Sequence, residues 1–178
     1  MIIRDVADDI RIAVDTIDGQ SADGGDLTGR QRERNAVNGF LRKLLGDVAL
    51  RHDEAGKPLL EGYNISISHT VNKQGGYVAI MISRKHQVGI DIEYVSERVM
   101  KIAERFLRND ENPKTVADHL VCWCAKEAVY KLFSSDDLTY QQMRVNDDLT
   151  IVENLKGNVS VDIVSVVNDD FVLVYTYI

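Results

Sequence analysis

The chain has 178 residues, of which 44% are hydrophobic, and its formal net charge at pH 7 is −7. This length and composition are sufficient for a sizeable apolar core in one or two small domains. The negative charge argues against a nucleic-acid partner, although a local basic cluster can still bind an anionic substrate. No apolar run approaches transmembrane length, so the sequence predicts no membrane partner.

The first half of the chain, residues 1–83, is predicted to form a strand, a helix and a strand hairpin. Apolar alternation marks the first strand, and helical spacing of Val37, Leu41, Leu44 and Val48 marks the helix, for which Thr28 is the expected N-cap. The predicted segments are a strand at 9–17, a loop at 18–29, a helix from 30 to about 52, a loop at 53–62, and strands at 63–68 and 77–83.

The second half, residues 84–178, opens on the run Val88 to Glu93. Its β-branched residues predict a strand, and Asp91 and Glu93 then share one face roughly 6–7 Å apart. Two carboxylates so close repel each other unless a cation lies between them, and oxygen ligands suit Mg²⁺. The alternative for this run alone is an edge strand with a solvated acidic face.

A second helix is predicted from about Val116 to Phe133, with an apolar stripe at helical spacing. Glu127 and Lys131 are four residues apart and are therefore neighbours on its surface. Taken alone, this pattern also fits an ordinary surface Glu–Lys pair. Cys122 and Cys124 point to different sides of this helix, so a disulfide between them is geometrically poor.

Other predicted elements complete an α+β fold. Ser96 is the expected N-cap of a helix to about Leu107, and strands are expected at 141–145, 149–152, 159–167 and 171–178. Each half therefore contains a strand, a helix and a hairpin, with Tyr77–Ser83 in the place of Phe171–Ile178. The N-terminus lacks a signal-peptide pattern, and together with the unpaired cysteines this predicts a cytoplasmic protein.

Gly-Ile-Asp-Ile-Glu (89–93) followed by Trp-x-x-Lys-Glu-Ala-x-x-Lys (123–131) resembles the 4'-phosphopantetheinyl transferase superfamily. Gly-Lys-Pro (56–58) and Ser-Ile-Ser-His-Thr (66–70) resemble blocks of its long, surfactin-synthetase-activating type. The resemblance implies transfer of the phosphopantetheine arm of coenzyme A to a serine of an apo acyl or peptidyl carrier protein, releasing adenosine 3',5'-bisphosphate. It also implies a monomer of two similar halves with pseudo-twofold symmetry, the 4'-phosphopantetheinyl transferase fold.

The resemblance assigns roles to individual residues. Asp91, Glu93 and Glu127 would hold Mg²⁺, or Mn²⁺ in its place; Glu127 is the candidate base, and Lys131 would contact the transferred phosphate. Coenzyme A contacts would come from Lys57, Ser68, His69, Lys126 and Arg34. Lys126 alternatively only supports the site, and an isolated His69 would be structural. Arg34 enters because the first helix carries Asn35 and Asn38 where long members carry a basic residue for the 3'-phosphate.

Two rival functions also fit the sequence. One is a non-catalytic module that binds coenzyme A or a carrier protein, and the other is a Mg²⁺-dependent hydrolase of pyrophosphate bonds. Three acids kept together beside a lysine argue against the first, because unpaired charges destabilise a fold. Basic side chains proposed to meet an acidic carrier helix are Lys101, Arg105, Arg108 and Lys114.

Overall fold

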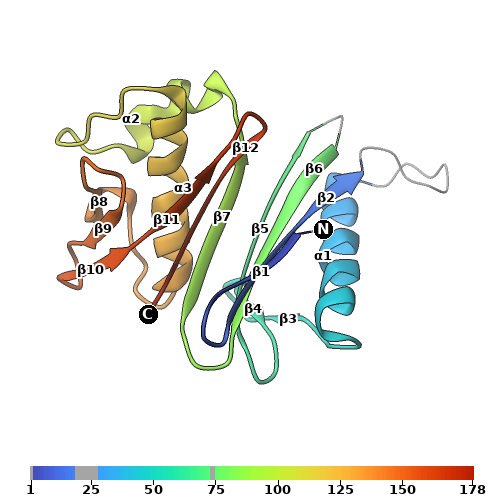
Figure 1. The fold of residues 1–178 in the computed structure, drawn as a ribbon. Helices are drawn as coiled ribbons and strands as arrows, with labels where there is room; N and C mark the ends of the chain where they lie inside the picture. The colour runs from blue at the N-terminus through green and yellow to red at the C-terminus, as the bar shows by residue number, and fades with distance from the viewer. Residues whose placement is uncertain (1, 19–27, 73–74) are drawn as a thin grey trace. The chain divides into compact units, whose positions relative to one another are not determined.

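The computed structural model describes residues 2–18, 28–72 and 75–178 (Figure 1). The chain divides into two compact units, Met1–His86 and Gln87–Ile178, which are called unit 1 and unit 2. The division falls after residue 86, whereas the sequence predicted it after residue 83. Within the described segments, no helix is both long enough and apolar enough to cross a bilayer.

Unit 1 is an antiparallel sheet of strand order β1-β2-β6-β5, with α1 (Gly29–Leu45) against one face (Figure 1). Val37, Phe40 and Leu41 of the helix are buried in one core with strand residues such as Ile80. The strands are β1 (Ile2–Ala7), β2 (Ile10–Asp18), β5 (Asn64–Asn72) and β6 (Gly75–Ser83), and β3 (Arg51–His52) pairs separately with β4 (Pro58–Leu59).

The structure confirms one local prediction for unit 1 and corrects two. Thr28 is the N-cap of α1, as predicted, and its Oγ1 accepts a hydrogen bond from the Gln31 N–H at 3.3 Å. The helix ends at Leu45 rather than near residue 52, because Gly46 adopts a φ of 80° and closes the last turn. The predicted strand start at Asp9 is instead a turn with a φ of 64°, and it joins the additional strand β1 to β2.

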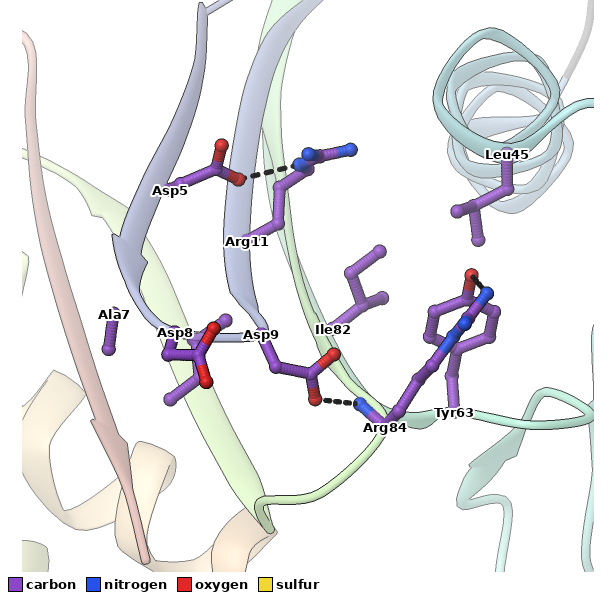
Figure 2. A pocket seen from close by; sticks show the side chains of 10 residues that line it. Asp5, Ala7, Asp8, Asp9, Arg11, Leu45, Tyr63, Ile82 and Arg84 are labelled. Carbon is purple, nitrogen blue, oxygen red and sulfur yellow. Dashed lines mark hydrogen bonds and ion pairs between the residues drawn. The ribbon is translucent and has the colours of Figure 1, made fainter.

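Asp9 also fixes the segment that follows β6 (Figure 2). Its Oδ2 accepts hydrogen bonds from Ser83 Oγ at 2.9 Å, Arg84 N at 2.7 Å and Lys85 N at 2.9 Å. The Arg84 guanidinium in turn donates to the Tyr63 hydroxyl at 2.9 Å and lies 5.0 Å from the centre of its ring. These bonds hold residues 83–85 onto unit 1, in agreement with the division after residue 86.

Unit 2 combines α3 (Val116–Leu132) with two antiparallel sheets, of strand orders β11-β12-β7 and β10-β9-β8. Buried α3 residues such as Val121, Ala125 and Val129 share one core with Val172 and Val174 of β12. The strands are β7 (Val88–Tyr94), β8 (Met143–Val145), β9 (Ile151–Asn154), β10 (Val159–Asp162), β11 (Val164–Val167) and β12 (Phe171–Tyr177). Shorter helical segments are η1 (Glu97–Ile102), α2 (Ala103–Phe106) and η2 (Tyr140–Gln142).

Two elements of unit 2 are divided where the sequence predicted continuity. The helix capped by Ser96 begins as the 3₁₀ segment η1 and only its last turn, α2, is α-helical. The strand predicted over 159–167 is interrupted at Ile163, whose N–H donates to Thr150 O at 2.8 Å. Because of this interruption, β10 and β11 belong to different sheets.

The two units repeat one strand order. In unit 1 the order β2-β6-β5 places β6, the last of these three in the chain, between β2 and β5. In unit 2 the order β7-β12-β11 places β12, again the last of its three, between β7 and β11. In both, the helix follows the first of these strands in the chain, so β6 corresponds to β12 as the sequence predicted. A mixed α and β fold is therefore present, and the pseudo-twofold relation between the halves stays a prediction.

Gly89 allows β7 and α3 to approach closely. A Cβ atom at this position would lie 2.0 Å from the backbone oxygen of Ala128 on α3, and 2.9 Å from its carbonyl carbon. The obstacle is backbone, so a side chain at residue 89 must push the helix away from the strand. The glycine of the Gly-Ile-Asp-Ile-Glu motif therefore sets the distance between the two elements that carry the acidic residues.

We expect Gly89→Ala to lower the free energy of unfolding by about 2 kcal/mol or more, because overpacking shifts helix or strand. Urea unfolding followed by circular dichroism measures the change. Gly39→Ala is the matched control: a Cβ at Gly39, inside α1, meets no atom within 4 Å. That variant should gain about 0.5–1 kcal/mol from helix propensity. Equal stability of the two variants would contradict the close-contact argument.

Both cysteines of the chain are buried in unit 2 as free thiols. Burial raises the pKa of Cys122 to about 12, and burial with the nearby charges of Asp91 and Glu93 raises the pKa of Cys124 as well. Since only a thiolate is alkylated, we expect neither thiol to react with iodoacetamide at pH 8 in the native protein. Both should react in about 6 M guanidinium chloride, which unfolds ordinary domains, as intact mass would show. Rapid native alkylation of either would contradict this burial.

Candidate active site in unit 2

Asp91 and Glu93 share one face of β7, as the alternation predicted, and this face packs against α3, a contact that the sequence analysis did not predict. Gly89, Asp91 and Glu93 are alternate residues of β7, and Gly89 is in contact range of α3. Asp91 is buried and Glu93 is half-buried. The negative charges of both also reach Cys124 on α3 and contribute to its raised pKa. The two carboxylates therefore face the helix that carries Glu127 and Lys131.

Lys131 reaches from α3 to β7. Its Nζ lies 2.6 Å from Asp91 Oδ1 and donates a second hydrogen bond to Ile90 O at 3.0 Å. The side chain of Lys131 is 26% exposed, whereas that of Asp91 is 6% exposed. Lys131 therefore forms its ion pair with Asp91 on the neighbouring strand, and the alternative of an ordinary surface pair between Glu127 and Lys131 is wrong.

Glu127 is half-buried one helical turn before Lys131. Burial raises its pKa, and the nearby charge of Asp91 acts in the same direction. A hydrogen bond from the Tyr140 hydroxyl and the charge of Lys131 oppose this rise, but the pKa stays above its ordinary value. A carboxylate with a raised pKa is a better proton acceptor, which is the property needed in a general base.

Tyr140 is the residue of this site that the sequence analysis missed. Its hydroxyl donates to Glu127 Oε1 at 2.5 Å, and its ring lies 5.4 Å from that of Trp123 at an interplanar angle of 38°. Burial and the neighbouring Glu127 raise the pKa of Tyr140, so the hydroxyl keeps its proton and donates it. No periodic pattern marks this tyrosine, because it follows α3 in an irregular segment and reaches Glu127 only through the tertiary fold.

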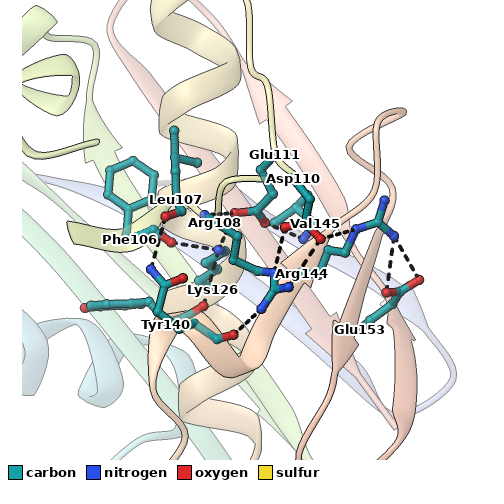
Figure 3. A network of polar contacts seen from close by, with 11 residues as sticks. Phe106, Leu107, Arg108, Asp110, Glu111, Lys126, Tyr140, Arg144, Val145 and Glu153 are labelled. Carbon is teal, nitrogen blue, oxygen red and sulfur yellow. Dashed lines mark hydrogen bonds and ion pairs between the residues drawn. The ribbon is translucent and has the colours of Figure 1, made fainter. Parts of the chain in front are cut away.

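Lys126 is placed as a support of the site, which was the alternative to a coenzyme A contact. Its side chain is 0% exposed, and Nζ lies 2.6 Å from Glu111 Oε2 (Figure 3). It also donates to Phe106 O at 2.7 Å and to Tyr140 O at 3.3 Å, so all three ammonium protons have acceptors within the protein. In this structure Lys126 does not offer its charge to a ligand.

In unit 1, the structure brings Arg34 and His69 to one cavity of about 870 Å³. Gly56 and Pro58, which flank the exposed Lys57, line the same cavity. Ser68 is not placed with them: it is buried on β5, and by alternation it faces away from His69. The remaining lining residues are Glu33, Val37, Asn38, Leu50, His52 and Ile67.

Glu33 changes the charge that was expected in this cavity. His69 Nδ1 lies 3.8 Å from Glu33 Oε1, so an acidic side chain stands beside the predicted phosphate contact. Arg34 lines the cavity, and Lys57 is exposed between two of its lining residues, Gly56 and Pro58. Glu33 was not anticipated, although its place one turn before Val37 on the predicted helix was a usable signal.

Comparison with known families matches part of this chain. Residues 87–174 fit the family model of the 4'-phosphopantetheinyl transferase superfamily. This range lies within unit 2, Gln87–Ile178. Unit 2 is therefore similar to the phosphopantetheinyl transferase superfamily, and the matched range includes Asp91, Glu93, Glu127 and Lys131. No curated protein gave a significant match to the chain.

The superfamily match supports an enzyme of the transferase class, with a carrier protein and coenzyme A as its partners. A divalent metal is typical of such enzymes, and the candidate ligands here are Asp91, Glu93 and Glu127. Three carboxylates have the oxygen-ligand chemistry that a hard cation needs. Across residues 2–18, 28–72 and 75–178, however, no three His, Cys, Asp or Glu side chains are arranged to hold a metal ion. The three carboxylates therefore have the right chemistry for a divalent cation. Their geometry in this structure does not form a metal site, because Asp91 is paired with Lys131.

Proposed function

We propose that the protein transfers the 4'-phosphopantetheine arm of coenzyme A to a serine of an apo acyl or peptidyl carrier protein, releasing adenosine 3',5'-bisphosphate. This is a holo-[acyl-carrier-protein] synthase reaction. The observation that carries the proposal is the superfamily match over residues 87–174 together with the meeting of Glu127, Asp91 and Lys131 within that range. We also propose the long, surfactin-synthetase-activating type, a monomer, and a cytoplasmic location.

Glu127 has the properties of the group that takes the serine proton. As the serine oxygen attacks the β-phosphorus of the pyrophosphate, a new P–O bond forms and the bond from that phosphorus to the bridging oxygen breaks. The serine proton passes to Glu127, directly or through one water, and the released nucleotide carries the leaving phosphate. The raised pKa of Glu127 places its proton affinity closer to that of a working base at neutral pH.

Lys131 is the candidate cation for the phosphate groups. Its ammonium is partly exposed and is already held at β7 by Ile90 O, so little ordering is needed when a phosphate approaches. Asp91, Glu93 and Glu127 would hold Mg²⁺ or Mn²⁺, which supplies charge neutralisation for a pyrophosphate when bound. Because Asp91 pairs with Lys131 in this structure, binding of such an ion requires the Asp91 carboxylate to move away from Lys131.

We propose that the unit 1 cavity binds the nucleotide end of coenzyme A through Arg34, Lys57 and His69. Arg34 and His69 line the cavity, and the Lys57 N–H donates to Asp53 Oδ1 at 2.8 Å, which fixes the loop that carries this lysine. Ser68 contributes to the fold of β5 in this proposal, because it is buried on the other face of the strand.

A carrier protein would meet the exposed basic side chains Lys101 and Arg105. Arg108 is less suited to this role than the sequence suggested, because its guanidinium donates to Gln141 O at 2.5 Å and pairs with Asp110 at 2.9 Å. Charge reversal at Arg108 would therefore disturb the fold as well as a partner. Charge reversal at Lys101 or Arg105 is therefore the better test of whether basic side chains contribute to carrier affinity.

The reaction is tested by the intact mass of an apo carrier protein after incubation with this protein, coenzyme A and Mg²⁺, with EDTA as the control. A metal-dependent gain of one phosphopantetheine arm on the carrier is the expected result. No gain with several fatty-acid, polyketide and peptide-synthetase carriers would overturn the proposal. If coenzyme A still bound, the non-catalytic module would be the better description, and carrier-independent cleavage of coenzyme A would favour the pyrophosphate hydrolase.

A further inference from the structure

Tyr140 is held by α3 at both of its ends. Lys126 Nζ binds the backbone oxygen of Tyr140 at 3.3 Å, and Glu127 Oε1 accepts the hydrogen bond from its hydroxyl at 2.5 Å. Lys126 and Glu127 are consecutive residues of the helix and point about 100° apart. The tyrosine therefore spans the angle between two neighbouring side chains, one buried and one at the site.

The buried Lys126–Glu111 pair fixes the main chain around Tyr140 (Figure 3). Glu111 Oε2 also accepts from Arg108 N at 2.7 Å, and Oε1 accepts from Val145 N at 2.6 Å. The pair thus joins α3 to the segment after α2, to η2 and to β8. Four backbone segments meet at one ion pair, and η2, which begins at Tyr140, is one of them.

The Tyr140 ring is also held by packing. It packs on Trp123, whose own ring lies edge-on to Phe106 at 5.2 Å, and Phe106 is fully buried. A phenol held at its backbone, along its ring and at its hydroxyl has little freedom to turn. The Oε1 atom of Glu127 is consequently directed by a rigid partner, which fixes how the carboxylate is presented.

We infer that Tyr140 is a positioning residue for Glu127, and that the Lys126–Glu111 pair sets Tyr140 in place. This inference rests on the proposed transfer reaction. Tyr140 binds one oxygen of the Glu127 carboxylate and so leaves the other oriented for the proton of the attacking serine. Misplacement of a catalytic group by about 1 Å can cost about 100-fold in rate, so a fixed partner of this kind has a measurable effect.

The test is Tyr140→Phe, which keeps the ring on Trp123 and removes only the hydroxyl. We expect kcat for carrier modification to fall by about 10- to 100-fold while KM for coenzyme A is unchanged, because the lost contact orients a reacting group. Tyr130→Phe is the matched control, since Tyr130 is an exposed tyrosine of α3, the helix that carries Glu127. That variant should keep both constants.

A second readout separates positioning from general packing. Tyr140→Phe should lower the melting temperature in the wild-type background, and lower it less in a Glu127→Gln background, because the amide is a weaker partner for the hydroxyl. An unchanged kcat for Tyr140→Phe, or a rise in KM alone, would overturn the inference and leave the proposed function standing. If the wild-type protein modifies no carrier with Mg²⁺ present, the proposed function fails and the positioning role falls with it.

Discussion

Glu127→Gln is expected to reduce carrier modification by at least about 100-fold, and up to about 10,000-fold, with little change in stability. Glutamine has the shape of glutamate, and its amide oxygen can still accept the hydrogen bond from Tyr140. It cannot take up the serine proton, and it is a weaker ligand for a cation than a carboxylate. Transfer of the phosphopantetheine arm, followed by intact mass over time, measures the loss.

Glu104→Gln is the control for this experiment. Glu104 is exposed on α2 and has no contact with Glu127 or Lys131 among the described interactions, so its neutralisation should leave turnover unchanged. Thermal unfolding of both variants checks that the fold is intact. Normal turnover in Glu127→Gln would remove Glu127 from the mechanism, even if the protein were confirmed as a transferase.

The acidic and basic residues of unit 2 were predictable because they follow short, regular periods. Alternation along a strand placed Asp91 and Glu93 on one face, and helical spacing placed Glu127 next to Lys131. Their partners were not predictable in the same way. Lys131 reaches across to Asp91 rather than along its own helix, because the close packing at Gly89 brings β7 within its length.

Irregular segments explain most of the remaining differences. Tyr140 lies in η2 and approaches Glu127 because Lys126 and Trp123 hold it there, and neither contact has a sequence period. The break at Ile163 also depends on a partner distant in sequence, the carbonyl of Thr150. Local propensity favours one continuous strand over such a valine-rich stretch, and a tertiary hydrogen bond divides it.

Lys126 shows the limit of assigning roles by motif. It stands next to Glu127 in the sequence, and a lysine beside a phosphate site is readily taken for a ligand contact. In the fold, one position along the helix turns the side chain about 100°, from the site into the protein interior. The buried acid that it meets, Glu111, comes from the connection between α2 and α3.

Glu111→Ala is expected to destabilise the protein by about 3–5 kcal/mol, because it leaves the ammonium of Lys126 buried without a counter-charge. The side chains of Lys126 and Glu111 are 0% and 2% exposed, so neither charge of the pair is solvated by bulk water. The backbone N–H groups of Arg108 and Val145 lose their acceptor in the same change. Urea unfolding of unit 2, followed by tryptophan fluorescence from Trp123, measures the effect.

Glu153→Ala is the matched control, because Glu153 forms an ion pair of 3.3 Å with Arg144 at a partly exposed position. Its loss should cost about 1 kcal/mol or less. Similar stability of the two variants would show that the buried pair contributes no more than a surface one.

The double variant Glu111→Leu with Lys126→Met distinguishes an ion pair from a backbone support. Buried ion pairs can often be replaced by apolar residues without loss, because desolvation of the charges offsets their attraction. Here the pair also satisfies the carbonyls of Phe106 and Tyr140 and the N–H groups of Arg108 and Val145. Each such group left unsatisfied costs about 1–3 kcal/mol. We therefore expect the double variant to be clearly less stable than the wild type. Full recovery of stability would show that these four backbone groups do not depend on the ion pair.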